Sequence, residues 1–160
     1  MARWEQLAAD EPELAAQVKE SFDARAHHML ATVRRDGGPR ISGTEVIFAL
    51  GDVWLGSMWH SPKARDLIRD GRYALHSCSD DPPDWAGDAK LAGRAVEMKD
   101  PVTVRSVQAA RGGEWPTGRF HLFRLEIEEA ITLRLPDPPE HLVATRWHEG
   151  GGASVRLLTE

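Results

Sequence analysis

The sequence predicts a mainly β protein, a small antiparallel barrel of at least six strands with two or three short helices. Successive runs alternate apolar and polar residues, as half-buried strands do. Short glycine-containing turns join neighbouring runs both early and late in the chain, which is typical of hairpins, whereas a parallel α/β sheet would alternate strand and helix throughout. The 160 residues, 41% of them hydrophobic, fit one globular domain.

The chain is expected to begin with a helix inside residues 1–25, followed by the barrel over residues 26–160. Asp10 is a candidate N-cap, and Glu13 follows it three residues later, as in a capping box. Leu14, Val18 and Phe22 then recur at every fourth position and so share one face. This pattern predicts an amphipathic helix of about four turns.

A hairpin is expected to open the barrel. Residues 29–35 and 39–50 have the composition of strands, and the glycine turn of residues 36–38 lies between them. Residues 53–58 are predicted as the next strand along the chain.

A short helix is predicted after this strand. Ser61 fits the N-cap, Pro62 fits the first helical position, and Gly71 is expected in the left-handed position just past the last turn. The first turn carries Lys63 and Arg65, although the free N–H groups and the dipole of a helix favour negative charge there. A bound anion would reverse this cost; the alternative is that both side chains simply extend into water.

The second half of the chain supplies the remaining elements. Strands are predicted over 73–79, 89–98, 121–135, 142–148 and 153–159, with a bulge or bend in the long run 121–135 near Glu129 and Ala130. Residues 79–88 are rich in turn formers, so an exposed loop is expected. A surface helix is predicted from Lys99-Asp100-Pro101 to Gly112, with a narrow apolar face.

Composition argues against several classes of function. The net charge of -5 disfavours a nucleic-acid partner, and no apolar run reaches the roughly 18 residues of a membrane span. The first residues do not resemble a signal or transit peptide, so a cytoplasmic protein is expected. Cys78 is the single cysteine and is predicted to be a buried thiol. The adjacent His27 and His28 lack further ligands at metal spacing, so no metal is expected.

The order of several segments resembles the pyridoxamine 5′-phosphate oxidase-like family. They are LATVRRDGGPRISGTEV, VWLGSMWHSPKARDL, RYALHS, DAKLAGRAVE, FRLEIEEA and TRWHEGGG, and they extend over roughly residues 25 to 158. The resemblance implies a six-stranded antiparallel split β-barrel of Greek-key type. It also implies a homodimer with two cofactor sites in the clefts between subunits. Family members include flavin mononucleotide (FMN) enzymes and actinobacterial reductases that use the deazaflavin coenzyme F-420.

The resemblance also assigns residues to the cofactor. The S-x-K pattern implies that Ser61 and Lys63 bind its phosphate, with Arg65 as a nearby candidate. The other implied cofactor-binding residues lie on the second and third strands and in the late segment, where a tryptophan closes the cleft; they are Arg40, Ser42, Thr44, Met58, Trp59 and Trp147. His148 is a candidate proton donor. The catalytic residues stay open.

Three hypotheses for the function follow. The first is an oxidoreductase that moves a hydride between FMN, or alternatively the deazaflavin, and a small conjugated organic substrate. The deazaflavin tail would need extra cations, for which Arg34, Arg35, Arg65 and Arg69 are available. The second is a protein that stores, senses or carries the cofactor without turning it over. The third, an oligonucleotide-binding barrel, lacks a basic face. The chain also lacks the R-L-H-x-R segment of true pyridoxamine phosphate oxidases, which argues against that activity.

Overall fold

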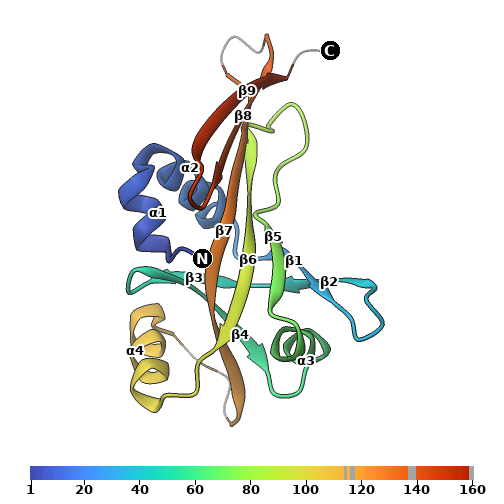
Figure 1. Cartoon of the computed structure of the whole chain (residues 1–160), viewed down its shortest axis with the longest axis vertical. Helices are drawn as coiled ribbons and strands as arrows, with labels where there is room; N and C mark the ends of the chain where they lie inside the picture. Colours follow the sequence, from blue (N-terminus) through green and yellow to red (C-terminus); the bar gives the residue numbers. More distant parts are fainter. Residues whose placement is uncertain (114, 116–117, 137–139, 159–160) are drawn as a thin grey trace.

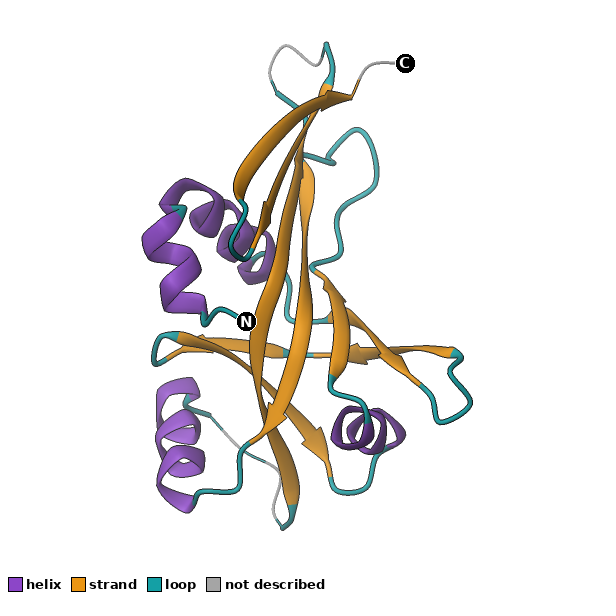
Figure 2. Cartoon of the chain, in the orientation of Figure 1, coloured by secondary structure: helices purple, strands orange, loops and turns teal. Residues whose placement is uncertain are grey.

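A computed structural model describes residues 1–113, 115, 118–136 and 140–158. Within them, four helices accompany a nine-stranded sheet (Figures 1 and 2). The helices are α1 (Trp4–Asp10), α2 (Pro12–Asp23), α3 (Pro62–Arg69) and α4 (Pro101–Arg111). The strands are β1 (His28–Val33), β2 (Pro39–Thr44), β3 (Val46–Ala49), β4 (Asp52–Met58), β5 (Arg72–His76), β6 (Gly87–Glu97), β7 (Phe120–Arg134), β8 (Leu142–His148) and β9 (Gly152–Leu158).

The sheet is antiparallel and is closed by one bent segment of chain. Its order is β2-β1-β5-β6-β7-β4-β3, so the consecutive strands β2 and β3 lie at opposite ends of the order. Thr44 pairs with His28 of β1, whereas Val46 pairs with Leu55 of β4. The chain therefore changes partners at Glu45 and contributes to both edges of the barrel. The single strand predicted over residues 39–50 was wrong in this respect, because periodicity alone does not show a change of partner.

The mainly β antiparallel fold class is confirmed. The six predicted barrel strands correspond to β1, the bent β2–β3 segment, β4, β5, β6 and β7. The β8–β9 hairpin is added beyond them through pairing of β8 with β7. Figure 1 shows β6 and β7 running along the length of the molecule, with this hairpin at one end and α3 and α4 near the other.

The barrel interior and α2 form the main core. Leu14, Val18 and Phe22 of α2 are buried, as their spacing predicts, and they join a cluster that includes Leu55 and Leu125. The helix begins at Pro12 after Glu11, so Asp10 is not its N-cap; Asp10 instead ends α1, a separate helix that the sequence pattern did not reveal. Cys78 is a free thiol that is only partly buried, contrary to expectation.

The predicted bulge is present one residue earlier than expected. Ala92 of β6 pairs with Glu129, but its neighbour Gly93 pairs with Ile127, so Glu128 is the extra residue. A Cβ at Gly93 would lie 2.0 Å from the Glu126 carbonyl oxygen, so only glycine fits at this approach.

The start of α3 is explained by its sequence as predicted, whereas Gly71 after its end is required for a different reason than expected. Ser61 is the N-cap, and its Oγ accepts a hydrogen bond from the Ala64 N–H at 3.3 Å. The chain leaves the helix in extended conformation at Asp70, and Gly71 does not adopt the expected left-handed conformation. Glycine fits there because a Cβ would lie 2.9 Å from the Ala95 carbonyl oxygen. None of the helices described is long and apolar enough to cross a membrane.

Candidate functional site

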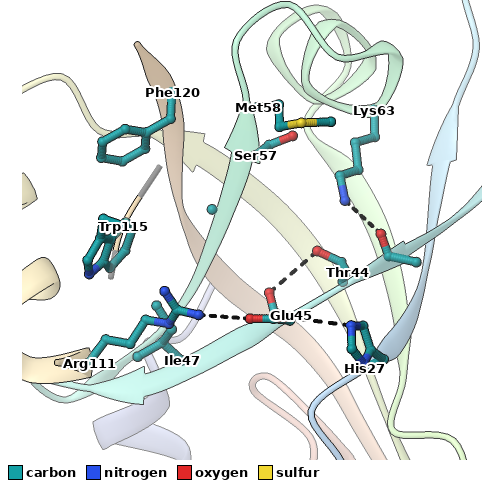
Figure 3. A pocket seen from close by; sticks show the side chains of 12 residues that line it. His27, Thr44, Glu45, Ile47, Ser57, Met58, Lys63, Arg111, Trp115 and Phe120 are labelled. Carbon is teal, nitrogen blue, oxygen red and sulfur yellow. Dashed lines mark hydrogen bonds and ion pairs between the residues drawn. The ribbon is translucent and has the colours of Figure 1, made fainter. Parts of the chain in front are cut away.

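A pocket of about 570 Å³ lies where the β2–β3 bend meets the end of β4 and the first turn of α3. α4 and the start of β7 complete it (Figure 3). Its lining consists of His27, Gly43, Thr44, Glu45, Ile47, Gly56, Ser57, Met58, Lys63, Arg111, Trp115 and Phe120.

One end of the pocket is polar and holds a lysine. Lys63 Nζ donates a hydrogen bond to the Gly43 carbonyl oxygen at 2.7 Å, and Thr44 lies beside this contact (Figure 3). Burial lowers the pKa of Lys63 from its ordinary value, although the charge of Glu45 acts in the opposite direction. The ammonium group is thus partly removed from water, and an anion bound beside it would stabilise its charge.

The first turn of α3 is already hydrogen-bonded in this conformation. Ser61 Oγ lies 2.7 Å from Ser57 Oγ and accepts from the Ala64 N–H, while the Arg65 N–H donates to the Ser61 carbonyl oxygen. The capacity of this helix end to bind an anion therefore depends chiefly on Lys63 rather than on several free N–H groups.

A carboxylate lies between the polar end and the opposite wall. Glu45 accepts from Arg111 at 2.9 Å, and His27 Nε2 lies 3.7 Å from its other oxygen. These partners come from α4 and from the residue before β1, so Glu45 ties together two walls of the pocket. Its negative charge also favours hydrogen-bond donors on any ligand near the centre.

The opposite wall is aromatic. The rings of Trp115 and Phe120 lie 5.4 Å apart and are tilted by 39°, and the Arg111 guanidinium lies 5.2 Å from the Trp115 ring. Trp115 Nε1 donates to the Gln108 carbonyl oxygen at 3.2 Å, which fixes the indole. A flat ligand with a polar or anionic end matches a pocket built in this way.

The structure brings together three of the residues expected at the cofactor and places Ser61 next to them. Thr44, Met58 and Lys63 line the pocket, and Ser61 caps the adjoining helix. Arg40, Ser42 and Thr44 share the less exposed face of β2, as alternation predicts, but of these only Thr44 lines the pocket.

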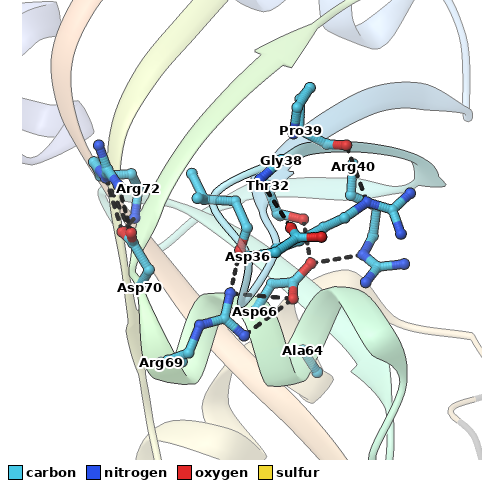
Figure 4. Close-up of polar contacts among 12 residues, drawn as sticks. Thr32, Asp36, Gly38, Pro39, Arg40, Ala64, Asp66, Arg69, Asp70 and Arg72 are labelled. Carbon is cyan, nitrogen blue, oxygen red and sulfur yellow. Dashed lines mark hydrogen bonds and ion pairs between the residues drawn. The ribbon is translucent and has the colours of Figure 1, made fainter.

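Arg40 is instead held by a buried carboxylate (Figure 4). Its Nε donates to Asp66 Oδ2 at 2.6 Å, and Asp66 also accepts from Thr32 at 3.0 Å and from Arg69 at 3.3 Å. Burial raises the pKa of Asp66, but the hydrogen bonds from Arg40 and Thr32 outweigh this and keep it below its ordinary value. This network attaches α3 to β1 and β2.

The remaining expected residues lie away from the pocket lining. Arg65 is exposed on α3. Trp59 stacks on His121 and lines a neighbouring pocket. Trp147 is only 3% exposed and packs in the main core, so its side chain fills the core rather than covering the cleft. His148 is exposed, with Nε2 3.7 Å from Glu128.

Comparison with solved structures clarifies the fold. PhzG from Burkholderia lata, solved in complex with tetrahydrophenazine-1-carboxylic acid, has a TM-score of 0.63 at 17% identity over 98% of this chain and 93% of its own. A putative pyridoxamine 5′-phosphate oxidase from Listeria innocua has a TM-score of 0.61 at 16% identity over 74% and 96%. A pyridoxinephosphate oxidase family protein from Clostridium acetobutylicum has a TM-score of 0.55 at 13% identity over 96% of both chains. No protein-family model and no curated protein matches the sequence.

The chain has the split-barrel fold of pyridoxamine 5′-phosphate oxidase-like proteins. The resemblance inferred from the order of the sequence segments is thereby confirmed at the level of the fold.

Several pocket residues of this split barrel escape sequence reasoning. Glu45 lies at the bend that periodicity did not reveal and Ile47 lies beyond it, while Arg111 ends a helix predicted as a surface element. Trp115 comes two residues after Gly113 in a connecting segment, where a large aromatic residue is a usable signal of a site. Within the described residues, no group of three or more His, Cys, Asp or Glu side chains is arranged to hold a metal ion.

Proposed function

We propose that the chain binds FMN in this pocket and acts as an oxidoreductase on a small, flat, conjugated substrate. The observation that carries the proposal is Lys63, a partly buried ammonium at the start of α3 with a backbone carbonyl as its hydrogen-bond acceptor. A phosphate is the ligand chemistry that such a lysine favours.

The residues present fit FMN. A volume of about 570 Å³ is in the range of small-molecule sites. Lys63 would bind the phosphate, with Ser61 contributing its hydroxyl proton. Thr44 and Met58 would contact the flat ring system, and Trp115 and Phe120 would shield it from water. When bound, FMN supplies the hydride-transfer chemistry, and the protein supplies orientation and exclusion of water.

Five of the residues that the resemblance implies do not line the pocket and have a smaller part or none in this proposal; they are Arg40, Ser42, Trp59, Arg65 and Trp147. Arg40 uses its Nε for Asp66 and has only its terminal nitrogens left for a ligand. Trp147 is left out because it is buried in the core.

A homodimer is the proposed assembly. Met29 and Ile41 on the outer face of β1 and β2 are 45% and 69% exposed, and they border an apolar groove that continues over β5, β6 and β7. Large apolar side chains grouped on one face favour association with a second copy.

FMN is preferred over the deazaflavin for a structural reason. The four arginines considered for the deazaflavin tail do not line the pocket, and two of them have internal partners: Arg34 donates to the Pro39 carbonyl oxygen, and Arg69 contacts Asp66 and Val33. The phenazine-type acid bound by the Burkholderia lata protein supports a flat, conjugated substrate. The alternative is a protein that binds FMN without turning it over.

A titration tests the proposal. Wild-type protein and Lys63→Ala are titrated separately with FMN and the deazaflavin while cofactor fluorescence is followed, and Lys19→Ala, which removes an equal charge from α2, is the control. We expect wild type and Lys19→Ala to bind FMN alike and Lys63→Ala to bind it more weakly. Equal affinity in all three proteins would refute the role of Lys63. Steady-state oxidation of reduced FMN by quinones would distinguish an enzyme from a carrier.

A further inference from the structure

A buried histidine outside the proposed cofactor pocket contacts the turn that leads into α3. His121, near the start of β7, is 4% exposed. Its Nδ1 lies 2.6 Å from Glu97 Oε1, its Nε2 lies 3.2 Å from the His60 backbone nitrogen, and Trp59 stacks on its ring at 4.4 Å and 10°. Both nitrogens and one face of the imidazole are therefore engaged.

These contacts determine the tautomer. The His60 N–H is a donor, so His121 Nε2 must accept. The proton of the neutral ring is then on Nδ1 and is donated to Glu97. A second proton on the ring would convert Nε2 from an acceptor into a donor and break the bond to His60.

The bond to His60 holds an unfavourable backbone conformation. His60 has a φ of 56°, in the left-handed region that residues with a Cβ rarely adopt. In the same turn, the Ser61 N–H donates to the Met58 carbonyl oxygen at 3.1 Å. Ser61 and Lys63 follow directly, so the conformation of this turn sets where the first turn of α3 points.

We propose that His121 is a positioning residue: in its neutral form it holds the turn of residues 58–61, and a second proton on it releases that turn and weakens ligand binding at Lys63. The second half of this statement rests on the proposed function. Glu97 fixes the ring through Nδ1, and Trp59 covers its face.

Charged groups of both signs lie around His121. Glu97 is negative, and the positively charged Lys99 lies 3.0 Å from Glu97. The His60 ring lies 6.1 Å from that of His121, and the Arg119 guanidinium lies 5.3 Å from the Trp59 ring. Burial raises the pKa of Glu97, but the hydrogen bonds from His121 and Lys99 outweigh it and lower that pKa, so Glu97 is a carboxylate beside the ring.

The first test needs no cofactor. Nitrogen NMR of the imidazoles gives the tautomer of His121, and hydrogen exchange gives the protection factor of the His60 amide between pH 5 and 8. We expect the Nδ1–H tautomer at pH 8 and protection that falls at least about threefold as His121 gains its second proton. His121→Phe keeps a ring against Trp59 but has no acceptor, so it should leave the amide unprotected at every pH. His121→Gln places an uncharged acceptor near Nε2 and should restore protection that does not depend on pH. Protection in His121→Phe equal to wild type would overturn the proposal.

The second test measures FMN affinity of the three proteins over the same pH range. We expect His121→Phe to bind FMN roughly threefold to tenfold more weakly than wild type at pH 8. Titration of the FMN phosphate affects wild type and His121→Gln equally, so it cancels in the ratio of their affinities for FMN. This ratio of wild-type to His121→Gln affinity should fall toward acid pH. A constant ratio, or equal affinity of His121→Phe and wild type at pH 8, would overturn the link to the site. Failure of all three proteins to bind FMN at any pH would refute the proposed function instead, while the amide data would still decide whether His121 holds the turn.

Discussion

Replacement of Asp66 by asparagine should destabilise the protein in a pH-dependent way. Asp66 is 3% exposed and accepts hydrogen bonds from Arg40, Thr32 and Arg69. A hydrogen bond to a charged group contributes about 1.5–3 kcal/mol. Since 23% of the Arg40 side chain and 36% of that of Arg69 are exposed, water replaces part of what is lost. We therefore expect Asp66→Asn to lower the free energy of unfolding by about 2–3 kcal/mol at pH 7.

The sign of the pH dependence follows from the lowered pKa of Asp66. A carboxyl whose pKa is lower in the folded state stabilises that state above its unfolded pKa, about 3.9, and loses this contribution as the pH falls through the folded value. The difference between wild type and Asp66→Asn should therefore be full at pH 7 and shrink below about pH 4. Urea unfolding followed by tryptophan fluorescence measures it.

A control at the end of the same helix separates this network from general loss of charge. Asp70 is the C-cap residue that follows α3, and it pairs with Arg72, whose side chain is exposed, so Asp70→Asn should change the urea midpoint much less. Equal midpoints for the two variants at pH 7, or a difference that is the same at pH 3 and pH 7, would refute the reasoning.

Four further outcomes are expected. Lys63→Ala should weaken FMN binding by about 1.5–3 kcal/mol in the titration described above, with the urea midpoint unchanged. Gly93→Ala should cost about 3 kcal/mol or more in urea unfolding, because its Cβ would lie 2.0 Å from a backbone oxygen of β7, whereas Gly43→Ala, with nothing within 4 Å, should be close to neutral. Burial raises the pKa of Tyr73, the single tyrosine, well above its usual range, so absorbance at alkaline pH should show no phenolate before the protein unfolds; earlier ionisation would contradict its burial. Ile41→Glu should shift a dimer to monomer in light scattering, and an unchanged mass would exclude this face as the interface.

The spacing of apolar residues correctly predicted elements, such as α2, whose buried residues all pack against a single core. Leu14, Val18 and Phe22 face one core, so their spacing alone gave both the helix and its buried face. Ser61 and Pro62 gave the start of α3 because capping is decided within one turn. Glu45 shows the limit: the residues on both sides of it have the composition of one strand, and only pairing with two distant strands bends the chain there.

The same limit applied to the site. Alternation correctly put Arg40 and Thr44 on one face of β2, but Thr44 lines the pocket while Arg40 is bonded to Asp66 of α3. Sequence gives the face of a strand and not the neighbour that covers each position. Trp147 illustrates the same point, because a tryptophan suited to covering a flat ligand is equally suited to filling a core, and here the core contains it.

Two contacts of α3 with β2 have different roles, one in the stability of the fold and the other in ligand binding. Asp66 attaches the helix to Arg40 near the start of β2, and Lys63 reaches Gly43 near its end. The carboxylate is buried and multiply bonded, so its loss lowers stability. Among the described residues the lysine has one backbone partner, Gly43, so its loss should leave the fold unchanged and remove the charge offered to a ligand. Asp66→Asn should therefore weaken FMN binding only indirectly, through movement of α3. Lys63→Ala should weaken it directly, with no loss of stability. A direct effect of Asp66→Asn on FMN binding, with no effect of Lys63→Ala, would mean that the phosphate lies at Arg40.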